Sequence, residues 1–252
     1  MLVRLQKIMA DRGYCSRRKA EEYITDGLVK VDGKVVDELG AKFEEDEVVI
    51  EIDGKLLKPV IDSEKYYFLV NKPLGFVTSL KDDRGRKTVD LLVPARYGRL
   101  FPVGRLDINT SGALIMTNDG DFANLVMHPS SQFNKTYLVV IRGIFTLTDK
   151  ARLEKGIMLE DGLTAPAKVK ILSSKISSSS VLITIHEGKN REVRRMMEEL
   201  HHGIISLSRR KIGGLSVAKL KTGQYAKIPL SIIEKIRETC IYNREHNTYK
   251  KI

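Results

Sequence analysis

The stretch GRLDINTSGA, residues 104–113, constrains the fold of this 252-residue chain more than any other segment. Asp107 stands two residues after Arg105 and just before a Thr-Ser-Gly turn at 110–112. The apolar residues 114–116 follow at once and predict a buried strand. The pattern therefore places one carboxylate at the mouth of a strand, with a cation and the amides of the turn nearby.

The charge of the chain indicates a polyanionic partner, since the net charge is +11 and the isoelectric point is near 9.5. Residues 1–62 hold 11 basic and 14 acidic side chains, residues 63–185 hold 17 and 11, and residues 186–252 hold 15 and 7. The excess thus lies in the body of the chain, which favours a folded surface that binds a phosphate backbone. From charge alone, a basic protein without a nucleic-acid role is the alternative.

Several classes of protein do not fit the sequence. No apolar run approaches the roughly 18 residues of a membrane span, and residues 1–13 lack the apolar core and cleavage site of a secretory signal. Cys15 and Cys240 are far apart, so we expect no disulfide framework and a reducing, cytoplasmic compartment. The chain has no GxGxxG or GxxxxGK[ST] motif, and His201 and His202 are adjacent, so we expect neither a cofactor nor a metal.

The first 60 residues predict a compact module of two short helices and a small β unit. Apolar spacing predicts a helix over residues 3–13, and Ser16 is a natural N-cap for a second helix that ends at Gly27. Asp32-Gly33 and Asp53-Gly54 each lie between short β segments, which indicates two hairpins.

This module resembles the S4 RNA-binding domain over RLQKIMADRGYCSRRKAEEYITDGLVKVDGKVV. The resemblance implies RNA contacts from the basic cluster around the turn and the second helix, namely Arg12, Arg17, Arg18 and Lys19. The amides at the start of that helix could also meet phosphate. Ordinary solvated charges are the alternative interpretation of this cluster.

The rest of the chain mixes strands and helices without βαβ repeats, after a linker predicted at residues 58–64. We expect an α+β fold with a mixed, mainly antiparallel sheet. The predicted domains are 1–60, an S4-like module; 65–240, a larger domain; and 241–252, a polar tail. Predicted strands cover 66–73, 76–79, 114–118, 135–143, 166–174, 181–188 and 225–230; predicted helices cover 89–93, 120–128, 146–157 with Thr148 as cap, 191–202 with Gly203 as stop, and 231–240.

Four motifs in this order resemble the RsuA-like family of pseudouridine synthases. These are Asn71-Lys72-Pro73-Leu74-Gly75, the GRLDxxTSG pattern around Asp107, Lys135-Thr136-Tyr137, and EGKNREVRRM at residues 187–196. The resemblance, with the S4-like module, covers about residues 2–235. It implies an enzyme that breaks the N1–C1′ bond of a uridine in RNA, turns the base and rejoins it through C5.

The resemblance also implies roles for three catalytic residues. Asp107 would start the reaction, either as a nucleophile or as a base. Arg194 matches the basic position that pairs with the aspartate and would keep it ionised, while Arg195 points elsewhere and meets RNA phosphate. Tyr137 would stack on the uracil and help remove the C5 proton. No second catalytic carboxylate is needed, unlike in glycoside hydrolases.

Further residues are implied to bind RNA. Arg105 would enter the helix when the uridine is flipped out, which costs a few kcal/mol. Arg191 and Lys72 would contact RNA, although a structural role for Lys72 is equally open. The motifs look most similar to the branch that modifies large-subunit (23S) ribosomal RNA, acting as a monomer away from membranes. A small-subunit rRNA or tRNA target, a non-catalytic S4-type ribosome-assembly factor and a hydrolase are the alternatives.

Overall fold

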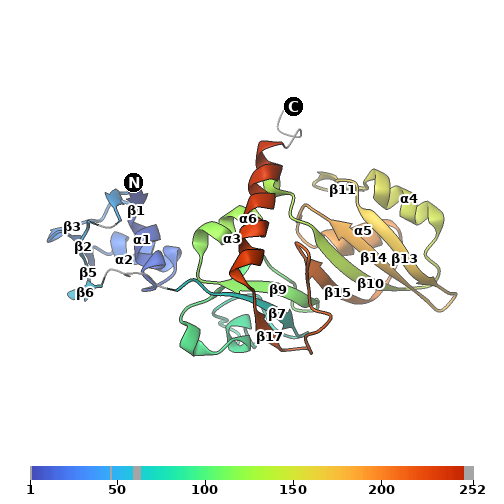
Figure 1. The fold of residues 1–252 in the computed structure, drawn as a ribbon, viewed down its shortest axis with the longest axis horizontal. Helices are drawn as coiled ribbons and strands as arrows, with labels where there is room; N and C mark the ends of the chain where they lie inside the picture. The colour runs from blue at the N-terminus through green and yellow to red at the C-terminus, as the bar shows by residue number, and fades with distance from the viewer. Residues whose placement is uncertain (1, 46, 59–63, 247–252) are drawn as a thin grey trace. The chain divides into compact units, whose positions relative to one another are not determined.

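The computed structural model describes residues 2–45, 47–58 and 64–246, and the chain divides into two compact units at Lys65/Tyr66 (Figure 1). The predicted linker at 58–64 falls largely on residues 59–63, which lie outside the described residues.

The N-terminal unit holds two helices and short strands around one core. Its elements are β1 (Leu2–Arg4), α1 (Leu5–Asp11), α2 (Arg17–Thr25), β2 (Val29–Val31), β3 (Lys34–Val35), β4 (Lys42–Glu44), β5 (Ile50–Ile52) and β6 (Lys55–Leu57). Apolar side chains of both helices and of β2 and β5 pack together in its core. The first predicted helix begins only at Leu5, because residues 2–4 pair with β4 instead.

The predicted turns of this unit are confirmed. Ser16 caps α2 by accepting a hydrogen bond from the amide of Lys19 at 3.1 Å. Asp32 and Asp53 take positive φ angles of 52° and 48° at the two hairpins, each followed by a glycine. These are the backbone angles that the Asp-Gly pair tolerates and that a tight hairpin requires.

The larger unit is built on one long sheet with helices on both faces. Its elements are β7 (Tyr67–Lys72), the 3₁₀ helices η1 (Val89–Leu92) and η2 (Ala95–Tyr97), β8 (Phe101–Val103), β9 (Ser111–Thr117), α3 (Gly120–Met127), η3 (Pro129–Ser131), β10 (Lys135–Arg142), α4 (Leu147–Lys155), β11 (Met158–Leu159), β12 (Gly162–Leu163), β13 (Lys168–Ser174), β14 (Ser178–Ile185), α5 (Glu192–Glu199), β15 (Ile204–Ile212), β16 (Leu215–Ser216), β17 (Tyr225–Lys227) and α6 (Leu230–Glu245).

The sheet has the strand order β13-β14-β10-β15-β9-β7-β17, with β16 beside β15 and β8 beside β9. Among the described strands, β15 and β9 run parallel, and the other pairs of this sheet run antiparallel. The predicted α+β fold with a mixed, mainly antiparallel sheet is therefore confirmed.

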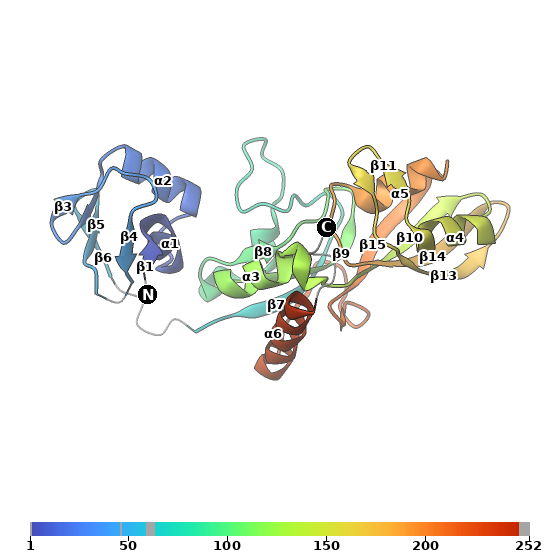
Figure 2. The same ribbon diagram turned by 90° about the horizontal axis from the view of Figure 1, so that it is seen from above.

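Two apolar layers enclose the middle of the sheet. On one face of the sheet, apolar side chains of β7, β9, β10 and β14 form one cluster with those of α4 and α5. The opposite face of β7 and β9 packs against α3 and α6. Figure 2 shows α4 and α5 on one side of the sheet and α6 on the other. Because β9 is buried on both faces, its sequence is continuously apolar, as the run at 114–116 predicted.

Four local predictions were wrong. Residues 76–79 form no strand, and Val77 makes only an isolated bridge to Thr88. Thr146, not Thr148, caps α4, because its side chain and that of Asp149 form a reciprocal capping box.

The ends of two helices also differ from the prediction. Helix α5 ends before Gly203, since His201 already takes a left-handed φ of 60°. Helix α6 continues through Glu245, so residues 241–245 are part of the larger unit and not of a polar tail.

Candidate active site

Asp107 lies in the loop between β8 and β9, and contacts from elsewhere in the chain fix this loop. The Thr78 hydroxyl donates to the carbonyl of Leu106 at 2.6 Å, and the amide of Gly75 donates to the carbonyl of Ile108 at 2.8 Å. The amide of Thr110 closes the turn onto the carbonyl of Asp107 at 3.0 Å. The carboxylate is thus held at the mouth of a buried strand, on the side of the sheet where α5 lies.

Two guanidinium groups approach the Asp107 carboxylate. Arg194 Nε is 3.6 Å and Arg191 Nη1 is 3.9 Å from Oδ2 of Asp107. The Asp107 side chain is 32% exposed, so its carboxylate is partly open to solvent. Arg194 also donates to the carbonyl of Asn109 at 2.8 Å and to the Thr110 hydroxyl at 3.1 Å. Arg194 therefore places a positive charge beside Asp107 and also fixes the backbone of the loop that carries it.

Arg194 and Arg195 diverge, because adjacent helical residues point about 100° apart. The guanidinium of Arg195 forms two hydrogen bonds to the carboxylate of Asp161, at 2.8 and 3.0 Å. Asp161 thus holds Arg195 within the protein, and the expected contact of Arg195 with RNA phosphate stays a prediction. Burial and the charge of Arg191 lower the pKa of Arg194, and the charge of Asp107 opposes this lowering.

Tyr137 is the third predicted catalytic residue, and β10 places it in the same pocket. Its side chain is 9% exposed, and Arg209 Nη1 lies 3.5 Å from its hydroxyl oxygen. The pocket has a volume of about 720 Å³, and Asp107, Tyr137 and Arg194 all line it. The structure thus brings together three residues that are 30 and 57 positions apart in sequence.

Lys72 is placed under the pocket and not on the RNA-facing surface. Its side chain is fully buried, and Nζ donates to the carbonyls of Pro73 at 3.0 Å and Phe76 at 2.8 Å. Burial lowers the pKa of Lys72 to about 8, while the charge of Asp107 opposes that shift. The predicted RNA contact of Lys72 is therefore corrected, because RNA cannot reach this ammonium group.

An ionisable cluster that the sequence analysis did not single out lies at the other end of the pocket. Burial lowers the pKa of Lys135 to about 8, and Nζ donates to the carbonyls of Phe133, His186 and Glu187. Burial and the neighbouring Glu187 raise the pKa of Glu192, which is 4% exposed. Lys135 and both glutamates stand inside motifs quoted above, but only the fold shows that they share a pocket.

The remaining candidates for RNA contact differ in how far their side chains are exposed to solvent. Arg105 is exposed at the rim of the pocket, and Arg17, Arg18 and Lys19 are exposed on the first turn of α2. Lys19 pairs with Glu22 at 2.6 Å. Arg12 is only 8% exposed and donates to the carbonyls of Glu45 and Val48, so its predicted phosphate contact is corrected to a cross-link inside the N-terminal unit.

Two further residues at the site were not singled out from the sequence. Thr78 supports the Asp107 loop, and Arg209 lies buried beside Tyr137. Neither follows a local pattern that reveals its role, since Thr78 meets a loop 28 residues away and Arg209 meets Ala113 across 96 residues. In the described part of the chain, no group of three or more His, Cys, Asp or Glu side chains could hold a metal ion.

Comparison with known families agrees with this geometry. A model described as RNA pseudouridylate synthase matches residues 66–199, and one described as S4 domain matches residues 3–49. This chain belongs to the RNA pseudouridylate synthase family. It is thus an isomerase, an RNA pseudouridine synthase with an S4 domain in front of its catalytic domain.

Individual members of the family extend the similarity over nearly the whole chain. A Bacillus subtilis protein named ribosomal large subunit pseudouridine synthase B is 46% identical over 93% of this chain and 95% of its own length. The Vibrio cholerae protein of that name is 36% identical over 98% of this chain and 78% of its own length. A crystal structure of a pseudouridylate synthase, 32% identical, superposes with a TM-score of 0.67 over 93% of this chain and 99% of that one. Over the described residues, no helix has the length and apolarity to span a membrane.

Proposed function

We propose that this pseudouridine synthase isomerises a specific uridine in 23S ribosomal RNA, with Asp107 as its essential carboxylate. The observation that carries the proposal is the meeting of Asp107, Arg194 and Tyr137 in one pocket, from three separate elements. The names and high coverage of the two relatives support the large-subunit target. We also propose that it acts as a monomer in the cytoplasm.

The reaction conserves all atoms of the nucleotide. The N1–C1′ bond breaks and its electron pair leaves with the base. The base turns, C5 bonds to C1′, the C5 proton is removed, and N1 gains a proton. Asp107 initiates this sequence at the ribose or the base, as a nucleophile or as a base. Arg191 and Arg194 place two positive charges beside its carboxylate in either role.

The other site residues position the flipped nucleotide. Tyr137 presents a ring against which the uracil stacks and a hydroxyl near its reacting edge. Arg105, exposed at the rim, fills the gap that the flipped base leaves in the RNA. Arg191, whose side chain is 45% exposed, can meet a flanking phosphate while it stays near Asp107.

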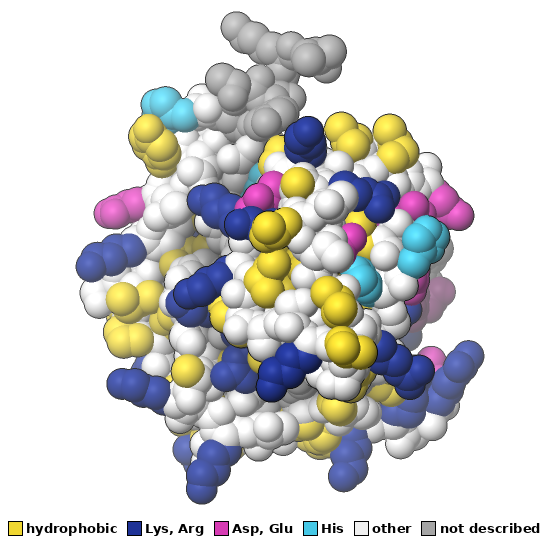
Figure 3. All heavy atoms as spheres, turned by 90° about the vertical axis from the view of Figure 1, so that its right-hand side faces the viewer, with side chains coloured by type: hydrophobic (Ala, Val, Ile, Leu, Met, Phe, Trp, Pro, Cys, Tyr) yellow, Lys and Arg dark blue, Asp and Glu magenta, His cyan; other side chains and the backbone are white. Residues whose placement is uncertain are grey.

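The charge of the larger unit is suited to RNA. Residues 63–252 hold 32 basic and 18 acidic side chains. Figure 3 shows the end of this unit that carries α4 and β13, where Lys and Arg side chains gather along the lower part of the face. Such a surface binds RNA through phosphate contacts, and Arg17 and Arg18 of the N-terminal unit add a second set.

The direct test uses ribosomal RNA that carries tritium at C5 of uridine. Isomerisation releases this tritium, so we expect release by the wild-type protein and none by Asp107→Asn. Asp90→Asn, an exposed carboxylate in η1, is the matched control and should release tritium at the wild-type rate. Mapping the modified position then identifies the target uridine.

Each outcome is informative. Release by Asp107→Asn at the wild-type rate would exclude the proposed role of the aspartate. Release from 16S rRNA or tRNA in place of 23S rRNA would overturn the proposed target but keep the activity. No release from any of the three RNAs or from pre-ribosomal particles would favour a non-catalytic assembly factor.

A further inference from the structure

Four residues of adjacent strands line up at one level of the sheet beneath the pocket. Lys72 of β7 is paired with Gly112 of β9, Gly112 with Arg209 of β15, and Arg209 with Tyr137 of β10. Residues that face each other across strands project to the same side of a sheet. Gly112 contributes no side chain, so Lys72, Arg209 and Tyr137 share the floor of the site.

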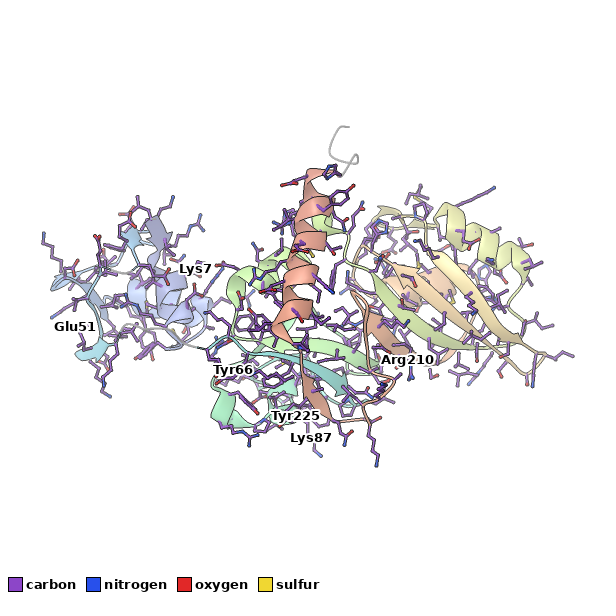
Figure 4. All side chains as sticks on the ribbon, in the orientation of Figure 1. Lys7, Glu51, Tyr66, Lys87, Arg210 and Tyr225 are labelled. Carbon is purple, nitrogen blue, oxygen red and sulfur yellow. The ribbon has the colours of Figure 1, made fainter. Side chains whose placement is uncertain are left out.

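The regular alternation of strand side chains directs Arg209, the residue paired with Tyr137, toward this floor. The pairing of β10 with β15 shifts between Thr136 and Tyr137, which leaves Arg210 as the extra residue on β15. Leu207, Arg209 and Ile212 are buried, whereas Arg210 is only partly buried and Lys211 is exposed. Of the two consecutive arginines, Arg209 thus lies beneath the pocket and Arg210, labelled in Figure 4, lies nearer the surface.

Within the part of the chain that the structure describes, no acidic side chain pairs with Arg209. The side chain is 2% exposed, Nε donates to the carbonyl of Ala113 at 2.6 Å, and Nη1 lies 3.5 Å from the Tyr137 hydroxyl. Among the described residues, its Nη2 has no hydrogen-bond partner and its guanidinium forms no ion pair. A buried charge of this kind costs stability unless something pairs with it.

The reaction supplies a charge of the opposite sign. When the N1–C1′ bond breaks, the electron pair goes to the base and spreads over its carbonyl oxygens. Arg191 and Arg194 are both near Asp107, and the Lys72 ammonium is bound to two carbonyls. Lys135 and Lys189, which also line the pocket, donate to backbone carbonyls, and Arg105 is exposed at its rim. Arg209 lines the same pocket and has a nitrogen without a hydrogen-bond partner among the described residues, so it is the cation best placed to meet the charge of the base. Water does not reach its Nη2, so its field in the pocket is little screened.

We propose that Arg209 stabilises the uracil anion while the base is detached from the ribose, and so keeps it in the pocket until C5 bonds to C1′. This inference rests on the proposed function. The protonation steps are those given above, and Arg209 keeps its own proton throughout.

The test compares Arg209→Lys with Arg209→Met, two unbranched side chains of which only lysine is charged. Single-turnover rates at saturating enzyme are measured on an RNA fragment with one target uridine, as the appearance of the C5-linked nucleoside after digestion. We expect Arg209→Met to be about 100-fold slower than wild type and Arg209→Lys to be within about tenfold of it. Arg210→Met is the matched surface control and should keep the wild-type rate.

A second measurement does not depend on how much of a variant is folded. The same fragment is made with 4-thiouridine at the target, whose sulfur spreads the charge of the departing base and eases its departure, while C5 keeps its proton. The ratio of the thiouridine rate to the uridine rate should be at least tenfold higher in Arg209→Met than in wild type, and Arg209→Lys should lower it again.

Equal rates for the Lys and Met variants, or a rate ratio unchanged in Arg209→Met, would show that Arg209 only packs the sheet and would overturn the inference. Failure of the proposed function looks different, because the wild-type protein would then convert neither RNA.

Discussion

At the scale of residues, Arg194 both pairs with Asp107 and holds the Asn109–Thr110 backbone of its loop. Arg194→Ala removes all of these contacts, so we expect the single-turnover rate of tritium release to fall at least about 100-fold. Arg195→Ala breaks only the pair with Asp161, which lies near the surface, and should change the rate less than about threefold. Equal losses in the two variants would contradict the assignment of Arg194 to Asp107.

The buried Lys72 makes stability depend on pH. Its folded pKa is about 8 against an ordinary 10.5, so between these values the unfolded chain binds more protons than the folded one. Stability therefore rises with pH through this window, by up to about 3 kcal/mol for this one group. We expect Lys72→Met to flatten the rise in the free energy of unfolding between pH 8 and 10, as measured by urea titration. Lys30→Met, an exposed lysine on β2, is the control and should keep the wild-type slope.

At the scale of elements, two threonines at the start of α4 make different contacts. Thr146 accepts from the amide of Asp149 at 3.1 Å, whereas Thr148 is exposed within the first turn. We expect Thr146→Ala to lower the free energy of unfolding by about 1 kcal/mol and Thr148→Ala to leave it nearly unchanged. Thermal unfolding followed by circular dichroism measures both; the reverse order would show that the capping box does not stabilise this helix.

The last turns of α6 support one wall of the pocket. Arg244 donates to the carbonyls of Asn124 and Leu125 near the end of α3, and Asn243 donates to the carbonyl of Ser131. The segment between them contains His128 and Pro129, which line the pocket. A chain ending at Cys240 should lose about 2 kcal/mol of stability and show a lower kcat/KM. A chain ending at His246 keeps these contacts and should match the full-length protein in both measurements.

At the scale of the whole molecule, Arg17 and Arg18 are exposed on α2 of the N-terminal unit, and neither forms an ion pair within the described residues. Replacing Arg17 and Arg18 together by alanine should weaken RNA binding and lower the slope of log K against log salt by about one unit per arginine. Alanine at Lys30 and Lys34, on the β2–β3 hairpin of the same unit, is the control. Binding and salt dependence equal to wild type in the Arg17/Arg18 variant would show that α2 does not contact RNA.

The two-domain plan, the hairpins and most helices could be predicted from the sequence, and the motifs also contain the three residues proposed to be catalytic. These features depend on short stretches of sequence, because an Asp-Gly pair, an N-cap serine or the motif around Asp107 acts mainly on its own neighbours in the chain. The same locality explains the errors, because Thr146 and Thr148 are equally plausible caps until the backbone is seen.

Which basic side chains are exposed and unpaired could be seen only in the tertiary structure. Arg12, Lys72 and Arg195 look like surface cations in sequence, yet the first two are buried and the third meets Asp161 across 34 residues. Arg209 and Arg210 are adjacent and chemically identical, and only the register of β15 against β10 shows which of them lies beside Tyr137. Burial and pairing depend on segments far apart in the chain, so no local pattern of residue types contains them.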